Sequence, residues 1–458
     1  MIKKNTEGIT LIVLVITIVV LMILASVTVS TLIGENGLIS FSKETKTEKI
    51  DEQVKKSIQT ELLEKKLENS NGEISNEEIV AILEKYGTIN YDSDGNIESL
   101  QVTETDTEIS FDELYNQNVK TVSDGVTIPE GFYYVGGSKN TGLVISDNIA
   151  DKEKYKGKSK VGTDLEGNQF VWIEVPKTTT VYPTAGLRIT DFTDAEYTKI
   201  ETDLHTYAND YRCSISYKDE YYSDATTGLT SSQYSALKKE MIKSVYQRGG
   251  FWIGRYEIGD ENATSTNTGR TSSTGTGNTP LIKANKIPYN YITCSQAESL
   301  AETFAPRGCT SSLMFGVQWD LVLKYLETKG VSQADLKTDS TSWGNYYGAS
   351  FVVTNINAKY STDNGANWTS VPTAGYTKPT GSVLLTTGAD ARNIKMNIYD
   401  LAGNVWEWTL ENTPDSWMPC NMRGGVCRNH GSAVPVAEWS SGFTNSSDEY
   451  TGARVALY

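Results

Sequence analysis

The chain is poor in the residue types from which metal and nucleophilic sites are most often built. Its 458 residues include only two His and five Cys. His205 and His430 cannot form a three-His metal centre, and no Cys-x-x-Cys pair is present to hold zinc. The five Cys are too few and too irregularly placed for a disulfide scaffold. Their odd number leaves at least one thiol unpaired in an oxidising compartment.

Other catalytic motifs are absent as well. The sequence has no G-x-S-x-G nucleophile elbow and no G-x-x-x-x-G-K-[ST] phosphate loop. Basic residues are also in deficit, since 41 Lys and Arg face 57 Asp and Glu, for a net charge of −16. Such a charge repels a phosphate backbone, so we expect no nucleic-acid partner.

One long apolar run stands at the N-terminus. Residues 9–33 contain neither a charge nor a proline, and at about 1.5 Å per residue they are long enough for a hydrocarbon core of roughly 30 Å. We therefore predict a transmembrane helix over 9–33, in preference to a signal peptide or a buried core helix. Lys3 and Lys4 precede it, which by the positive-inside rule leaves the rest of the chain outside the cell.

This N-terminus resembles a type IV prepilin leader, because a short basic head ends in Gly8 and is followed by Ile9-Thr10-Leu11. The resemblance implies a leader over 1–8, cleavage between Gly8 and Ile9, and other pilin-like subunits as partners. Val13 stands where pilins usually carry a glutamate. The expected location is the cell membrane, with a single pass and the C-terminal part on the cell surface or in a pilus.

The exported part divides into three predicted regions. Residues 34–70 carry Ile50, Val54, Ile58 and Leu62 at a spacing of four, which predicts an amphipathic stalk helix. Residues 71–125 are predicted to form a small pilin-like spacer domain with a helix over 77–86. From 126 to 458 short apolar runs alternate with turns, and strands are expected at 131–137, 170–176 and 251–258. Helices are expected at 294–304 and 316–327, so the fold class is α+β.

Four segments in the C-terminal region, in order, resemble the formylglycine-generating enzyme family, whose fold is C-type-lectin-like. They are IPEGFYYVGG at 128–137, FWIGRYE at 251–257, SLMFGVQWD at 312–320 and, most specific, YDLAGNVWEW at 399–408. RGG follows at 423–425 and GARV at 452–455. By position the resemblance implies a structural calcium ion held by Asp400, Gly403, Val405 and Glu407. Alternatively, Glu407 and Asn404 only hydrogen-bond backbone in a lectin-type loop.

Enzymes of this family oxidise a substrate cysteine through two cysteines and copper. Counted from Gly424-Gly425, those two positions fall on Asn429 and Val434, neither of which can bind Cu(I) as a thiolate. The resemblance therefore favours a binding domain without the chemistry. A copper-dependent oxidase and a structural pilin-like subunit remain the alternatives.

The tail 423–458 also resembles the variable proteins of diversity-generating retroelements, which display a hypervariable ligand-binding face on this fold. The resemblance implies an extracellular ligand of unknown kind, namely a protein, a glycan or a phage. An ordinary exposed strand and loop is the other interpretation of this tail. The candidate variable face comprises Val426, Cys427, Arg428, Asn429, His430, Val434, Val436, Ser440 and Ser441.

Overall fold

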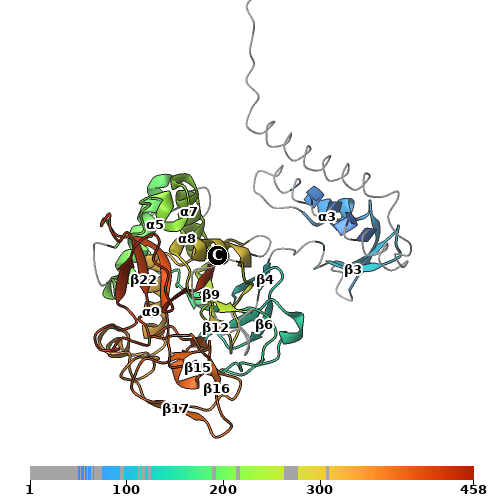
Figure 1. The fold of residues 1–458 in the computed structure, drawn as a ribbon. Coiled ribbons are helices and arrows are strands. Elements are labelled where there is room, and N and C mark those ends of the chain that lie inside the picture. The colour runs from blue at the N-terminus through green and yellow to red at the C-terminus, as the bar shows by residue number, and fades with distance from the viewer. Residues whose placement is uncertain are drawn as a thin grey trace, which may run out of the picture. The chain divides into compact units, whose positions relative to one another are not determined.

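The structure is a computed structural model in which the chain divides into two compact units, Met1–Gln117 and Asn118–Tyr458 (Figure 1). It describes residues 50–458 except 52, 56, 59, 63–64, 66–74, 93–96, 112–113, 115–118, 122–124, 188–191, 213–216, 262–276 and 306–308. The predicted leader at 1–8, with its Gly8–Ile9 cleavage site, and the membrane helix at 9–33 lie outside these residues. No helix within the described ranges has the length and apolar character needed to cross a membrane.

The smaller unit has a core of its own. The residues described as helical between 50 and 65 bury Val54, Ile58 and Leu62 in one cluster with α3 and a three-stranded antiparallel sheet. Ser75 and Glu78 close a capping box at the start of α3. The apolar stripe predicted for a stalk thus packs into the same core as the predicted spacer. The elements are α3 (Asn76–Leu83), β1 (Gly87–Tyr91), β2 (Ile97–Val102) and β3 (Glu108–Ser110).

The larger unit is organised around a six-stranded sheet of order β13-β25-β9-β8-β7-β6. The last strand of the chain, β25, lies inside this sheet, between β13 and β9, and so fixes the C-terminal tail to the core. Trp172 and Trp252 pack edge to face beneath β8 and β9, with ring centroids 5.1 Å apart. The strands are β6 (Tyr133–Gly136), β7 (Val144–Ser146), β8 (Gln169–Glu174), β9 (Gly250–Gly254), β13 (Ser311–Leu313) and β25 (Val455–Leu457).

A second sheet, of order β23-β22-β21-β24, carries most of the tail. Its strands are β21 (Trp406–Asn412), β22 (Cys420–Arg423), β23 (Trp439–Gly442) and β24 (Thr451–Ala453), with β24 parallel to β21. Shorter pairs are β4 (Val119–Thr121) with β5 (Thr127–Pro129), and β10 (Gly259–Asp260) with β11 (Pro280–Leu281) and β12 (Ile287–Pro288). The others are β14 (Phe351–Val353) with β17 (Tyr376–Lys378), β15 (Lys359–Ser361) with β16 (Thr369–Ser370) and β18 (Leu384–Leu385), and β19 (Ile394–Lys395) with β20 (Ile398–Tyr399).

Helices α5 and α7 lie side by side at one end of this unit, and β15 to β17 lie at the other (Figure 1). Thr193, Thr230 and Thr293 each begin a helix with a capping box. The helices are α5 (Asp194–Tyr207), α6 (Asp224–Thr227), α7 (Ser231–Arg248), α8 (Cys294–Ala301) and α9 (Gly316–Thr328). Short turns of helix are η1 (Ile149–Asp151), η2 (Asn209–Tyr211), η3 (Glu302–Phe304), η4 (Ala334–Thr338) and η5 (Ala391–Asn393).

The mixture of sheets and helices confirms the predicted α+β class. The helices predicted at 294–304 and 316–327 correspond to α8 with η3 and to α9. The strand predicted at 251–258 is too long, because β9 leaves the sheet after Gly254. Helices α5 and α7 were not predicted, because their buried positions are few and do not form a regular apolar stripe.

Candidate functional site

The tail leaves β22 through a tight turn at Gly424 and Gly425. Both glycines have positive φ, +93° and +78°, and a Cβ on Gly425 would lie 2.8 Å from the ring of Tyr346. The backbone then passes directly into the core, where Val426 and Cys427 have no solvent exposure; farther along, Val436 is equally buried. These three side chains are therefore not part of an exposed face, contrary to the prediction, because they pack into the main hydrophobic cluster.

The next tail residues do reach the surface. Arg428 and His430 are exposed, while Asn429 and Val434 are half-buried. The Arg428 guanidinium carbon lies 4.5 Å from the centroid of the Tyr450 ring, a cation–π contact. These residues are the first part of what we call the tail face, which is the set of tail residues that reach the surface.

Tyr347 lies beside this part of the tail face. It was not predicted from the sequence. Its backbone N–H donates to the Asn429 carbonyl over 2.8 Å, and its ring centroid lies 5.1 Å from that of His430. The Tyr347 side chain is 43% exposed. Nothing in the local sequence around 347 distinguishes it, since its neighbourhood arises only when distant segments meet.

The second part of the tail face is β23, an edge strand of the second sheet. Ser440 and Ser441 on this strand are half-buried, and Ser441 lies 4.0 Å from the sulfur of Met418. The adjacent Trp417 and Phe443 are 76% and 48% exposed. Large exposed aromatic side chains beside small polar ones are common in recognition surfaces.

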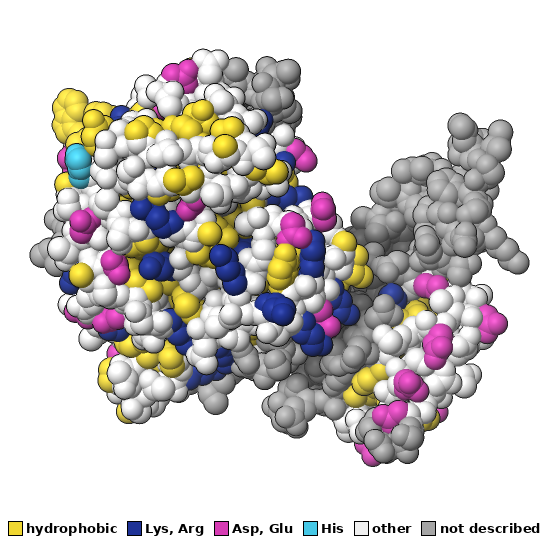
Figure 2. Space-filling view, turned by 90° about the horizontal axis from the view of Figure 1, so that it is seen from below, with side chains coloured by type: hydrophobic (Ala, Val, Ile, Leu, Met, Phe, Trp, Pro, Cys, Tyr) yellow, Lys and Arg dark blue, Asp and Glu magenta, His cyan; other side chains and the backbone are white. Residues whose placement is uncertain are grey.

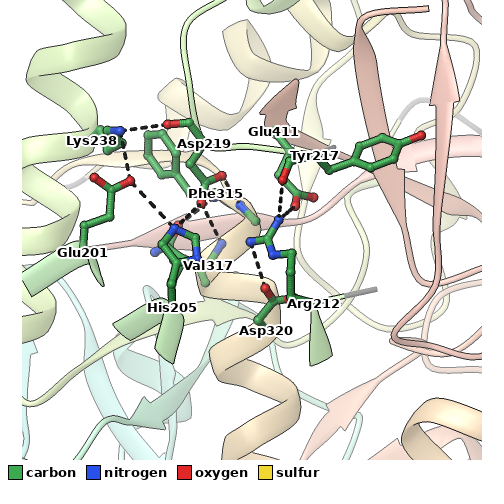
Figure 3. A network of polar contacts seen from close by, with 12 residues as sticks. Glu201, His205, Arg212, Tyr217, Asp219, Lys238, Phe315, Val317, Asp320 and Glu411 are labelled. Atoms are coloured by element: carbon green, nitrogen blue, oxygen red, sulfur yellow. Dashed lines mark hydrogen bonds and ion pairs between the residues drawn. The ribbon is translucent and has the colours of Figure 1, made fainter. Parts of the chain in front are cut away.

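Beneath the tail face lies a network of buried charges. Arg423 donates through Nη1 to the Ala437 carbonyl at 2.6 Å, and its Nε lies 3.0 Å from Glu411 Oε2. Its Nη2 pairs with Asp320. Arg212 pairs with the same two carboxylates, with Nη2 2.8 Å from Asp320 Oδ2 (Figure 3). The positive charges of the two arginines thus balance the negative charges of the two carboxylates. These ion pairs join the tail to α9 and β21.

A second group of charges continues this network toward the surface (Figure 3). The Asp219 carboxylate accepts from the backbone N–H groups of Gly316 and Val317 at 2.6 and 2.9 Å, which caps α9. His205 Nε2 lies 3.7 Å from Asp219 and 3.8 Å from Glu201. Burial lowers the pKa of His205, but these two carboxylates outweigh it and raise the pKa above its ordinary value.

The sequence contained signals for this network that were not used. Asp320 stands between Trp319 and Leu321 in α9, and Glu411 follows Leu410 in β21, where every position is buried. Acidic side chains at buried positions require a positive partner. Arg423, which the sequence marks only as the first residue of the RGG motif at 423–425, is that partner.

The residues proposed for calcium do not fit a calcium site. Both oxygens of Glu407 bond the guanidinium of Arg454, at 2.6 to 3.1 Å, so a side-chain cation already occupies the carboxylate. Asp400 Oδ2 accepts from the Gly388 N–H at 2.6 Å. Within the described ranges, no group of three or more His, Cys, Asp or Glu side chains is arranged to hold a metal ion.

The lectin-type loop is held instead by Asn404. Its side-chain oxygen accepts from the Leu385 N–H at 3.0 Å, and its amide donates to Glu257 at 2.7 Å. Burial and the neighbouring Asp400 and Glu407 raise the pKa of Glu257 well above its usual range. Burial likewise raises the pKa of Asp400 to about 6. Asn404 thus bonds the backbone of Leu385 but also the Glu257 side chain, and Glu407 bonds the Arg454 side chain, so neither residue bonds backbone alone as the alternative interpretation expected.

The oxidase alternative requires two reactive thiols near Asn429 and Val434. Cys427 is fully buried, its sulfur lies 3.6 Å from Ser382 Oγ, and burial raises its pKa to about 12. Cys420 has other neighbours, with its sulfur 3.6 Å from the Thr226 carbonyl. A buried thiol with a raised pKa is a poor nucleophile and a poor copper ligand.

Two hollows lie outside the tail. One, of about 360 Å³, is lined by residues of α5 and α7, including His205, and by residues 212 and 217–220. The other, of about 400 Å³, is lined by Tyr155, Lys160, Tyr399 and Asp390 among others.

The acidic net charge does not describe every face. Figure 2 shows several Lys and Arg side chains over one face of the larger unit. Lys152, Lys154, Lys156, Lys158 and Lys160 alternate along one loop, and all are exposed. The absence of a nucleic-acid partner rests on net charge alone and stays a prediction.

The described residues define an α+β protein in which buried ion pairs join a C-terminal tail to α9 and β21. No known family model matches the sequence, and no curated protein matches it.

Among solved structures, the chain is similar to CarF, with 14% identity and a TM-score of 0.29 over 45% of this chain and 85% of that one. It is also similar to Treponema denticola variable protein 1, with 13% identity and a TM-score of 0.25 over 45% and 84%. For PvdO from Pseudomonas aeruginosa the identity is 16% and the TM-score 0.26, over 46% and 81%. TM-scores this low do not establish a common fold.

Proposed function

We propose that this chain is a ligand-binding protein that presents the tail face on a rigid, non-catalytic scaffold of the formylglycine-generating-enzyme-like kind. In this proposal, the tail is the variable region of a diversity-generating-retroelement target protein. Residues 9–33 hold the chain in the membrane, and the larger unit lies outside the cell. The ligand is extracellular.

The observation that carries the proposal is that the tail contains both surface residues and buried residues that hold its backbone. Arg428, Asn429, His430, Ser440 and Ser441 have side chains at or near the surface. The backbone that bears them is anchored on both sides, by the buried residues at 426, 427 and 436 and by the paired Arg423. Such an arrangement lets surface side chains change while the ordering cost of the backbone is already met.

The preference for binding over chemistry rests on the thiols. Copper-dependent oxidation of a cysteine requires two thiolates at one place, and the tail carries Asn429 and Val434 at those positions. Cys427 is held as a buried thiol with a high pKa. We therefore expect no aldehyde when the full chain is incubated with copper, oxygen and a Cys-containing peptide.

A substitution series tests the proposed face directly. In full-length chain purified in detergent, Arg428, Asn429, His430, Ser440 and Ser441 are each replaced by Ala, Tyr and Asp. We expect changes in free energy of unfolding within about 0.5 kcal/mol. Matched replacements of Val426 or Val436 by Asp or Ala should cost about 2–5 kcal/mol, since they open cavities or bury a charge. Equal sensitivity of both sets would remove the variable-face proposal.

Binding is tested with two probes, a glycan array and intact phage particles. The wild-type chain is compared with the Arg428→Ala/His430→Ala variant and with Lys239→Ala, a control at a half-buried residue of α7 far along the chain from the tail. A ligand of the tail face is lost by the double variant and kept by the control. A ligand kept by all three binds elsewhere.

The genome supplies a further test. A retroelement target should have a reverse-transcriptase gene nearby and a template repeat that matches the codons of 423–458. Without both, the chain is a binding protein with a constant tail. The second candidate, a structural pilin-like subunit, predicts ladders of covalently crosslinked chains on the cell surface.

A further inference from the structure

Two buried cysteines far apart in sequence lie against each other. Cys294 begins α8 and Cys420 begins β22, and each is 1% exposed. The Cys420 side chain lies close enough to act on the Cys294 thiol, and together with burial it raises the pKa of Cys294 well above its ordinary value. The structure shows both as thiols.

The other contacts of these sulfurs agree with this placement. Cys294 Sγ lies 3.6 Å from the carbonyl oxygen of Thr409, whose partner across the β21–β22 ladder is Asn421, the neighbour of Cys420. Cys420 Sγ lies 3.6 Å from the carbonyl oxygen of Thr226 in α6, and α6 packs against α8. Both sulfurs are thus held at one junction of helix and sheet.

We propose that Cys294 and Cys420 form a disulfide when the chain folds in an oxidising compartment. The co-reactant is a small-molecule disulfide. One cysteine thiolate attacks it, releases one small thiol and forms a mixed disulfide. The second cysteine thiolate then attacks the protein sulfur of that mixed disulfide and releases the other small thiol. Two electrons pass to the small-molecule disulfide, and the two protons from the cysteines end on the released thiols.

This bridge joins α8 to the strand that leads into the tail. Cys420 lies three residues before Arg423, so the bond fixes the start of the tail face to the helical layer. The linked cysteines enclose a long loop that includes β13, α9 and β21. Closing a long loop restricts the unfolded chain and so stabilises the folded one. The bond does not depend on the proposed ligand.

The remaining described cysteines have other surroundings. Cys309 lies 3.7 Å from Arg248 Nη1, and Cys427 lies beside Ser382. Cys213 lies outside the described residues. The inference therefore concerns one specific pair.

Peptide mapping tests the pair cleanly, because trypsin places each of the five cysteines on a different peptide. Cys294 falls on 287–307 and Cys420 on 396–423, while the others fall on 213–218, 308–324 and 424–428. The full-length chain is unfolded in detergent and reductant and refolded in a buffer of oxidised and reduced glutathione. Free thiols are then alkylated before digestion without reductant. We expect 287–307 linked to 396–423, and 308–324 and 424–428 alkylated.

Thermal unfolding gives the second measurement. We expect the oxidised chain to melt about 3–6 °C above the reduced chain. Cys294→Ser and Cys420→Ser should each abolish the linked peptide and the difference, whereas Cys309→Ser should keep both. If a serine variant does not fold, the comparison of oxidised with reduced wild-type chain still tests whether the disulfide forms. Recovery of both peptides as free thiols, or either one linked to a different peptide, would overturn the inference.

Discussion

Replacing Arg423 by Met removes the charge that connects the tail to the scaffold while keeping a side chain of similar length. Arg423 is 1% exposed and pairs with Asp320 and Glu411, and its Nη1 donates to the Ala437 carbonyl. After the substitution, Arg212 alone faces two buried carboxylates. One negative charge then remains buried without a partner.

Breaking a buried pair in this way costs about 3–5 kcal/mol, far more than the pair contributes relative to apolar groups. The larger unit has about 340 residues, for which the entropy of unfolding is roughly 0.7 kcal/mol/K. The melting temperature of this unit should therefore fall by about 4–7 °C. We also expect the tail face to lose its ligand, since the carbonyl of Ala437 loses its anchor.

The assay is differential scanning calorimetry of the full-length chain in detergent. Lys239→Met is the matched control, because Lys239 pairs with Asp194 at the surface, where side-chain exposures are 39% and 87%. Exposed pairs contribute about 0–1 kcal/mol. If Arg423→Met lowers the melting temperature no more than Lys239→Met does, the buried network does not hold the tail.

Three further outcomes follow from buried or paired groups. Burial raises the pKa of Glu298 to about 8. The folded chain therefore keeps a proton that the unfolded chain releases above pH 4.5, and stability falls by a few kcal/mol as pH rises toward 8. Glu298→Gln should remove this loss in pH-dependent melting. By NMR, His205 should titrate above its ordinary pKa. Its contribution to stability is therefore present at low pH and is lost as pH rises through the raised pKa of the folded chain. Asp219→Asn should lower the pKa of His205. Calcium or a chelator should shift the melting temperature by less than about 1 °C, because Arg454 already pairs with Glu407.

Each of these outcomes has a contrary result. Wild type and Glu298→Gln melting in parallel from pH 4.5 to 8 would mean that Glu298 is ionised when folded. A His205 signal unchanged by Asp219→Asn would show that the Asp219 carboxylate does not act on it. A large stabilisation by calcium would show that the Glu407–Arg454 pair opens to admit the ion.

Much of the architecture was predictable because local patterns report burial. The four-residue spacing of Val54, Ile58 and Leu62 identified a buried helical face, although not that this face packs into the spacer's own core. The apolar residues in the sequences of α8 and α9 were sufficient to predict both helices. In α5 and α7 most positions face solvent, so their periodicity was too weak to read.

The candidate site was predictable only in outline. The resemblance of the tail to variable proteins predicted an exposed face, yet the tail residues have no periodicity that separates buried from exposed positions. Cys427 and Arg428 are neighbours in sequence, but one is buried and the other exposed. Their difference depends on what packs against each.

The sequence by itself determined the α+β class, the acidic balance, the scarcity of histidine and cysteine, and the position of the tail, because these follow from composition and short-range pattern. Only the tertiary structure decided which tail side chains face outward, that Arg454 pairs with Glu407, and that Cys294 and Cys420 lie at one junction of helix and sheet. Each of these depends on contacts between residues tens to more than a hundred positions apart, and such contacts exist only once the sheets and helices have packed.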